Sequence, residues 1–264
     1  MQRVLMISTL ALAIATPLSF GQKPPAPKSR AEGEAYNAIV TAPDSDSRIK
    51  AAEAFLLKYA DTELKSTALF IEAVSYQQKN DYEKMVIYAE RTIEADPKHY
   101  AAMLMLAKGI ALRSREFDLD KEEKLTRAEK LANQALELLK DAAKPNPQIT
   151  DEQWAEGKKE YLSQAHQALG YAAQTRKKYD VAMSEMQTAV EQAPDQVTMV
   201  KLAQVYNINN KPDEALAMLD KLNAIPDIHP TIRSFAQAER VRATQLKGGG
   251  AKPPAVPQVE IKKQ

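Results

Sequence analysis

The chain has 264 residues, 44% hydrophobic and 27% charged, which is enough for one extended or two compact folded domains. Its formal net charge is +1, and loss of residues 1–21 would remove Arg3 alone and leave 35 basic against 35 acidic residues, a balance that excludes a general nucleic-acid or anionic-membrane binder. The absence of cysteine excludes disulfides, thiol catalysis and a cysteine-anchored lipid.

The first residues have the organisation of an export signal. Arg3 supplies a positive charge, residues 4–15 are an apolar run, and small residues then allow cleavage after Gly21 or, as a second choice, after Ala15. A membrane anchor would need about 20 apolar residues, and this run is shorter. The sequence therefore predicts a signal peptide at 1–21, a proline-rich linker at 22–30, a periplasmic or secreted location, and no membrane insertion after cleavage.

Beyond the linker, apolar residues recur at helical spacing between breaks that are marked by proline. Strong helix formers predominate, and no alternating β-branched stretch is long enough to predict a strand. Thr150 and Gln153 form a capping box, and Pro230 suits the first turn of a helix. Helices are predicted over 31–40, 46–59, 64–79, 82–95, 100–115, 121–140, 151–177, 180–193, 196–209, 213–223 and 230–246. Residues 248–264 are predicted to be disordered.

The helical segments repeat as pairs. At an offset of 97 residues Ala73 aligns with Gly170, and at an offset of 33 Gly170 aligns with Ala203, so small residues recur at matched places. The first and second units match at an offset of 34 in their first helices and of 43 in their second helices. The second unit therefore carries nine extra residues within 113–124.

This pattern resembles the tetratricopeptide repeat (TPR) family in its period, its helix–turn–helix unit and its order of large, small and aromatic residues. Residues 81–97 resemble the family's turn and second helix, and Leu169 with Gly170 reproduces a pair from its first helix. The resemblance covers 64–223 in four tandem units. It implies an all-α fold of helix–turn–helix repeats that stack as a TPR-like α-solenoid with disordered termini.

Flanking segments extend the resemblance. Residues 31–62 are interpreted as a degenerate N-terminal helix pair, and the run at 55–62 is similar to repeat junctions in TPR proteins of bacterial cell envelopes. The TPR array, closed by a C-terminal capping helix, is predicted over 63–247, because repeat arrays need a solvating end. About twenty further residues around 140–161 would lengthen a helix or offset two halves of the array.

The chain departs from the family pattern at four positions. Glu72 stands where the family prefers Leu, and Met85 where it prefers Ala, so looser packing is expected in the first unit. His166 replaces a large apolar residue, and Pro212 replaces the aromatic residue of the turn.

No signature of catalysis is present. The three histidines, at positions 99, 166 and 229, have no partner at metal-ligand spacing, and neither phosphate-binding glycine motifs nor a serine-nucleophile motif occurs. We therefore predict no catalytic, metal-binding or cofactor-binding residue and no cofactor. The alternating charges of residues 113–124 favour a solvated loop and helix start. The alternative is a partner contact with Phe117 as its anchor.

In TPR proteins, side chains of the first helices line a concave groove that holds a peptide or a helix. Carried over position by position, the resemblance predicts these groove residues: Phe70, Val74, Gln77, Leu104, Lys108, Gln167, Tyr171, Gln174, Val200, Gln204 and Asn207. Some family members grip a C-terminal carboxylate there with Lys and Asn, but the first unit offers Phe70 and Val74 instead. The groove is thus predicted to be neutral and to suit an amphipathic helix or an extended segment. Alternatively the protein covers these residues itself, for example with Val256, Val259 and Ile261.

These observations predict an exported, non-catalytic TPR adaptor of the bacterial-envelope type that binds a protein or peptide segment in its concave groove. The alternative is a structural or self-associating envelope assembly factor, although the missing lipid-anchor cysteine weakens kinship with lipoprotein assembly factors. An enzyme or enzyme subunit is a third class, which no site signature supports. The sequence does not name the partner.

Overall fold

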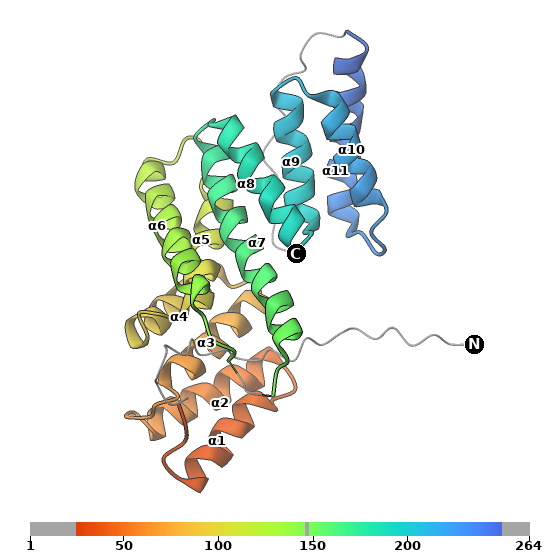
Figure 1. Ribbon diagram of the computed structural model, residues 1–264. Coiled ribbons are helices and arrows are strands. Elements are labelled where there is room, and N and C mark those ends of the chain that lie inside the picture. Colours follow the sequence, from red (N-terminus) through yellow and green to blue (C-terminus); the bar gives the residue numbers. More distant parts are fainter. Residues whose placement is uncertain (1–24, 146–147, 250–264) are drawn as a thin grey trace, which may run out of the picture. The chain divides into compact units, whose positions relative to one another are not determined.

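The computed structural model describes residues 25–145 and 148–249, and within these ranges the protein consists of α-helices without β-strands (Figure 1). Every predicted helix is confirmed, with bounds that agree to within two residues. The helices are α1 (Arg30–Val40), α2 (Ser45–Lys58), α3 (Lys65–Gln78), α4 (Tyr82–Ala95), α5 (Tyr100–Arg113), α6 (Lys121–Lys140), α7 (Asp151–Thr175), α8 (Tyr179–Gln192), α9 (Gln196–Ile208), α10 (Pro212–Asn223) and α11 (Pro230–Lys247).

Several predicted segments fall outside the described residues. The signal peptide predicted at 1–21 lies outside them entirely, as does nearly all of the tail predicted at 248–264. Of the linker predicted at 22–30, the described part precedes α1, which already begins at Arg30. Among the described helices, none combines the length and apolar character needed to cross a bilayer.

The chain forms two compact units. Unit 1 comprises Met1–Met103 and Glu137–Gly157, and unit 2 comprises Leu104–Leu136 and Lys158–Gln264. Helices α5, α6 and α7 each contribute residues to both units.

Unit 1 is built on successive packing of α1 on α2, α2 on α3 and α3 on α4. Ile39, Phe55 and Ile71, one from each of the first three helices, meet in a common core with smaller neighbours. Phe55 lies edge-on to the Tyr36 ring, with 5.8 Å between ring centroids. The segment predicted as a degenerate N-terminal pair therefore packs as a true helix pair against the first repeat.

Unit 2 depends on small side chains where helices approach closely. Ala107, Ala132 and Ala168 bring α5, α6 and α7 together. Between α7 and α8, a Cβ atom built on Gly170 would lie 2.7 Å from Met186 Cγ and 3.3 Å from its backbone nitrogen. Helix α9 packs on α8 and α10, and α11 packs on both α9 and α10. The final helix thus covers the last repeat.

The turns between paired helices repeat the offsets seen in the sequence. Asn80, Lys177 and Asn210 have positive φ angles of 56°, 62° and 57°, and they lie 97 and 33 residues apart. After each of them, a backbone N–H reaches the carbonyl five residues earlier at 2.9 Å, as Asp81 does to Tyr76. This hydrogen bond closes the first helix of each repeat with a left-handed residue.

Other sequence features appear where they were expected. The Thr150 N–H donates to Gln153 Oε1 at 3.0 Å, and the Gln153 N–H donates to Thr150 Oγ1 at 3.2 Å, which completes the capping box of α7. The insertion in the second repeat forms the loop at 114–120 between α5 and α6. His166 is half-buried, and its Nδ1 lies 2.7 Å from Glu185 Oε2. The extra residues before the third repeat make α7 a helix of 25 residues.

Glu72 is the main irregularity in the core of unit 1. Its side chain is fully buried on α3, and neither carboxyl oxygen has a hydrogen-bond partner among the described residues. Burial, reinforced by the charge of Glu53 and opposed by Arg91, raises the pKa of Glu72 to about 8. The carboxyl group is therefore neutral at pH 7, which lets it occupy a position where the family has Leu.

Replacing Gly170 with Ala tests the close contact between α7 and α8. We expect a loss of about 1–3 kcal/mol in the free energy of unfolding, because Met186 must move and its backbone is already near. Gly157→Ala in the same helix is the matched control, since its Cβ would meet only Trp154 Cε3 at 3.8 Å. The control should gain up to about 1 kcal/mol from helix propensity. Equal melting behaviour of the two variants would contradict the tight contact.

Glu72 makes the stability of unit 1 depend on pH. Its folded pKa of about 8 exceeds the unfolded value of 4.5, so the stability is greatest below pH 4.5 and falls as the pH rises through 8. We expect Glu72→Leu to remove this fall and to stabilise the protein above pH 8 by roughly 1–3 kcal/mol. Denaturant unfolding across pH 4–9 measures it, with the exposed Glu94→Leu as control. A pH profile unchanged by Glu72→Leu would refute this account.

Candidate protein-binding face

The predicted groove residues lie on the first helices of the repeats, and most of them are enclosed. Only Gln77 is exposed, while Lys108 and Gln174 are half-buried. Eight are buried, namely Phe70, Val74, Leu104, Gln167, Tyr171, Val200, Gln204 and Asn207. The alternative that the protein covers these residues itself therefore describes most of this set. The part of that alternative that concerned Val256, Val259 and Ile261 lies outside the described residues.

Within unit 2, polar groove residues of α7 and α9 pair with each other. Gln174 Nε2 donates to Gln204 Oε1 at 2.9 Å, and the hydroxyls of Tyr171 and Thr198 lie 2.6 Å apart. Both contacts join residues that sequence analysis placed in separate repeats. The structure thus brings the third and fourth predicted groups together on one face, and their polar atoms already have partners.

Lys201 adds a charge that the prediction of a neutral groove missed. Its Nζ lies 5.3 Å from the centroid of the Tyr171 ring, in cation–π contact across α7 and α9. Desolvation by burial lowers the pKa of Lys201 to about 8. The sequence showed little sign of this contact. Lys201 is the neighbour of the predicted residue Val200, and its side chain reaches the Tyr171 ring only because α9 packs beside α7.

Asn207 joins α9 to the last helix. Its Nδ2 donates to the Glu239 backbone carbonyl at 2.9 Å and to Glu239 Oε2 at 2.8 Å. Burial raises the pKa of Glu239, although Asn207 and the nearby Arg242 oppose this shift. The groove position at Asn207 is consequently an anchor for α11, and its side chain is fully buried.

In unit 1, the predicted residues are less connected. Phe70 packs on the buried His99, with ring centroids 4.6 Å apart, and burial lowers the pKa of His99 to about 4. His99 Nδ1 accepts a hydrogen bond from the Ala102 N–H at 3.2 Å, so this imidazole is a neutral structural group. Val74 is buried, and Gln77 is the accessible member of the first group.

No group of three or more His, Asp or Glu side chains in the part of the chain that the structure describes could hold a metal ion. His229 is exposed, and its Nδ1 accepts from the Thr231 N–H at 3.3 Å.

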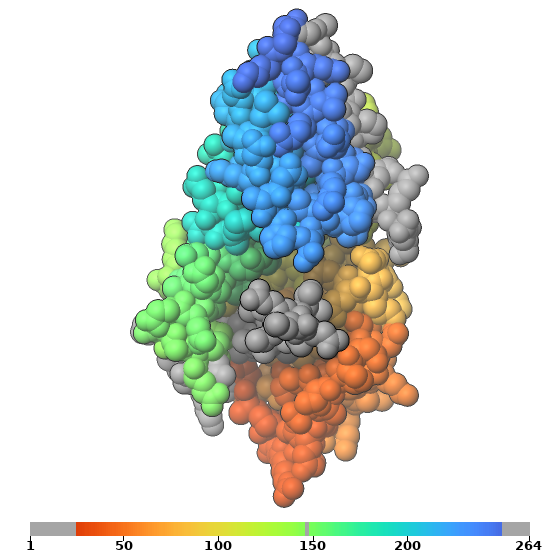
Figure 2. Space-filling view, turned by 90° about the vertical axis from the view of Figure 1, so that its right-hand side faces the viewer, coloured from red at the N-terminus to blue at the C-terminus, as the bar shows by residue number. Residues whose placement is uncertain are grey.

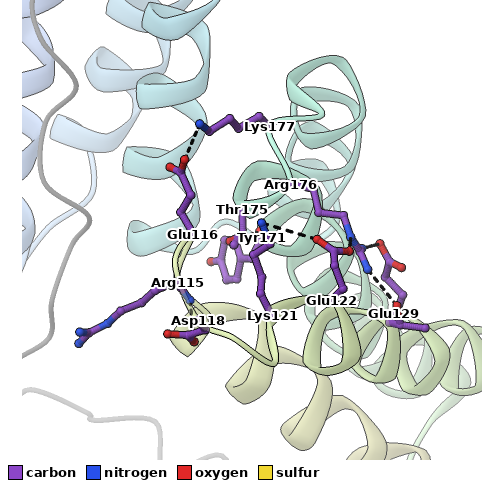
Figure 3. Close-up of polar contacts among 11 residues, drawn as sticks. Arg115, Glu116, Asp118, Lys121, Glu122, Glu129, Tyr171, Thr175, Arg176 and Lys177 are labelled. Atoms are coloured by element: carbon purple, nitrogen blue, oxygen red, sulfur yellow. Dashed lines mark hydrogen bonds and ion pairs between the residues drawn. The ribbon is translucent and has the colours of Figure 1, made fainter.

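The loop at 114–120 is the second surface that sequence analysis considered. Figure 3 shows the polar contacts that hold it to the end of α7. Lys177 Nζ lies 2.5 Å from Glu116 Oε1, and Arg176 Nε donates to Glu122 Oε2 at 2.7 Å. The charges of this region therefore pair internally, as expected for a solvated loop and helix start. Phe117, named as a potential anchor, is 88% exposed.

Comparisons with known proteins agree with this architecture. Residues 66–99 match the family model of the tetratricopeptide repeat. A thermophilic TPR protein from Thermus thermophilus is 15% identical and has a TM-score of 0.53, with 80% of this chain and 96% of that chain covered. A TPR protein from Parabacteroides merdae is 16% identical, with a TM-score of 0.41 and coverage of 84% and 94%. The search of curated proteins gives no match.

The chain has the TPR fold. The family model covers α3 and α4, where the predicted first unit lies, and the Thermus structure extends the likeness of fold to most of the chain. TPR proteins generally act as scaffolds for contacts between proteins, and they are generally not catalytic. A role as an interaction adaptor or scaffold is therefore supported for this protein.

Proposed function

We propose that the protein is an exported, non-catalytic TPR adaptor that binds an amphipathic helix or an extended segment of another protein on the face formed by its first helices. The main support is the packing of α7 against α9. The side-chain amides of Gln174 and Gln204 are hydrogen-bonded to each other there, and Lys201 lies over the Tyr171 ring. Amide groups of this kind hydrogen-bond to a backbone or a polar side chain, and apolar neighbours supply anchors.

Because most of the predicted groove residues are buried, only a few of them could touch a partner directly. In unit 2, Lys108 and Gln174 remain accessible and are the first expected contacts, and Gln77 is the accessible predicted residue of unit 1. Tyr171 and Val200 are almost completely buried, so they would contribute by holding the helices in place and not by touching the partner. Lys201 would favour a segment that carries a carboxylate, since this lysine has no ion-pair partner among the described residues.

Photo-crosslinking in intact cells tests the proposed face. A photoreactive residue at Gln174 should capture a discrete protein partner, whereas one at the exposed Ser184 on α8 should not. With the captured protein purified, Gln174→Glu combined with Lys108→Glu should weaken binding about tenfold, since each alters an accessible contact. Ser184→Glu is the matched control. Equal affinity of the double variant and the parent would count against this face.

Export is a separate part of the proposal and has its own test. The support is the charged start, apolar run and small-residue exit of residues 1–21. We expect the full chain, expressed in a bacterium, to be recovered outside the cytoplasm, with Gln22 as its N-terminal residue. Replacing Leu10 and Leu12 with Arg should keep the chain uncleaved and inside the cell. Retention of the uncleaved parent in the cytoplasm would contradict export.

A further inference from the structure

Glu72 lies in the core of unit 1 without a polar contact that would explain its presence. Its side chain has no exposed area, and both carboxyl oxygens lack a hydrogen-bond partner among the described residues. Figure 2 shows side chains of the first helices, in red and orange, packed against one another at the surface of this unit. A carboxylate shut off from bulk solvent and from donor groups is strongly unfavourable, so this packing suits only the neutral acid.

Two cations on the neighbouring helix α4 have no ion-pair partner. Arg91 Cζ lies 5.1 Å from the centroid of the Tyr88 ring, and Lys84 Nζ lies 5.1 Å from the centroid of the Tyr76 ring. Neither cation forms an ion pair with another described residue. Lys84, Tyr88 and Arg91 follow one another at intervals of four and three residues, so they share one face of α4.

Two tyrosine rings connect the buried acid with these cations. The ring centroids of Tyr76 and Tyr88 are 5.1 Å apart and the planes differ by 23°, so the rings are stacked between α3 and α4. Tyr76 follows Glu72 by four residues, which places it one turn further along the same side of α3. We call Tyr76 and Tyr88 the tyrosine stack. An unpaired acid and two unpaired cations thus lie next to the same stack.

The groups around Glu72 act on its ionisation in opposite directions. The negative charge of Glu53 on α2 disfavours the carboxylate, whereas the positive charge of Arg91 on α4 favours it. Burial is the largest effect, and it raises the pKa of Glu72 to about 8. Burial also raises the pKa values of Tyr76 and Tyr88 above 10. Of these three buried or half-buried acids, Glu72 is therefore the one that changes its charge between pH 7 and 9.

Arg91 is the cation that can compensate an ionised Glu72. A guanidinium gains more from a carboxylate at low dielectric than from the face of an aromatic ring near solvent. Arg91 is exposed, while Glu72 has no exposed area. Arg91 can therefore reach the carboxylate only if it leaves the Tyr88 ring and α4 shifts relative to α3.

We propose that ionisation of Glu72 switches the first repeat between two folded arrangements. In the closed one Arg91 rests on Tyr88, and in the open one α4 has shifted and Arg91 pairs with Glu72. A folded second state goes beyond the loss of stability that burial alone causes. Gln77 also lies on α3, so the switch alters the packing behind the accessible predicted residue of this unit. The switch is independent of the proposed binding function.

Thiol labelling of the naturally cysteine-free chain detects the open arrangement. Met85 on α4 is 3% exposed, so a thiol at Met85→Cys reacts with iodoacetamide only when α4 opens. The reference is Met85→Cys combined with Glu72→Gln, which retains the shape of the neutral acid and has the same thiol chemistry. The ratio of the two labelling rates should rise about tenfold between pH 7 and 9, because opening is linked to the loss of one proton.

The charges around Glu72 set the pH at which the switch acts. Arg91→Met should move the midpoint of the labelling ratio upward by at least about 0.5 pH unit, since a charge that favours the carboxylate is lost. Arg91→Lys should keep the midpoint near that of the parent. Glu53→Gln should move it downward, because a charge that opposes ionisation is removed. The exposed Lys130 on α6 is the matched control, and Lys130→Met should leave the midpoint unchanged.

Two further measurements separate local opening from global unfolding. A thiol at Ala215→Cys, fully buried on α10, should show a labelling rate that does not respond to Glu72→Gln. Hydrogen exchange of the cysteine-free parent needs no introduced thiol. The exchange rates of the α4 amides, divided by those of Glu72→Gln at the same pH, should rise between pH 7 and 9, while those of α10 should not. Far-ultraviolet circular dichroism should show unchanged helix content at pH 9.

Three outcomes would overturn the switch. The first is a labelling or exchange ratio that stays constant from pH 6 to 9. The second is a midpoint that does not respond to Arg91→Met, which would show that Arg91 does not pair with the ionised acid. The third is simultaneous opening at Met85→Cys and Ala215→Cys, which would mean that the whole chain unfolds and that no open folded state exists.

Discussion

At the contact between α7 and α8, Gly170 lies so close to Met186 that even one methyl group would require the neighbour to move. Ala107 and Ala168 serve the same need where α5, α6 and α7 meet. Helices that approach this closely bury their larger residues between successive pairs, and this burial is the main favourable term in the stability of a repeat array. Small residues at fixed intervals are therefore the constraint on which the other packing depends.

This constraint explains why the fold could be predicted from the sequence, whereas the burial of the predicted groove residues could not. Helix periodicity, the capping box at Thr150 and the small residues at positions such as Ala73 and Gly170 are local or repeat at a fixed period. The burial of Tyr171 and Asn207 depends instead on which helices lie beside them. Glu239, which holds Asn207, belongs to a helix that the repeat pattern treats only as a cap.

Two individual residues, Glu72 and Lys177, depart from what the family pattern describes. Glu72 was visible as a departure; in the structure its carboxyl oxygens are buried without a hydrogen-bond partner among the described residues, and this burial raises its pKa, which favours the neutral form. Lys177 was not visible, because a left-handed backbone leaves no mark on a lysine in the sequence. The signal that would have found it is the comparison of its turn with those at Asn80 and Asn210.

The polar contacts of the predicted face limit how it can recognise a partner. Tyr171 is hydrogen-bonded to Thr198, and Gln174 to Gln204, so α7 is tied to α9. A partner that took over these groups would break internal hydrogen bonds and gain only the difference between the old and the new ones. Recognition that adds contacts at accessible residues avoids this loss. Within unit 2, binding on the proposed face should therefore depend on contacts added at the accessible parts of Lys108, Gln174 and Lys201, while the existing hydrogen bonds chiefly keep α7 and α9 in register.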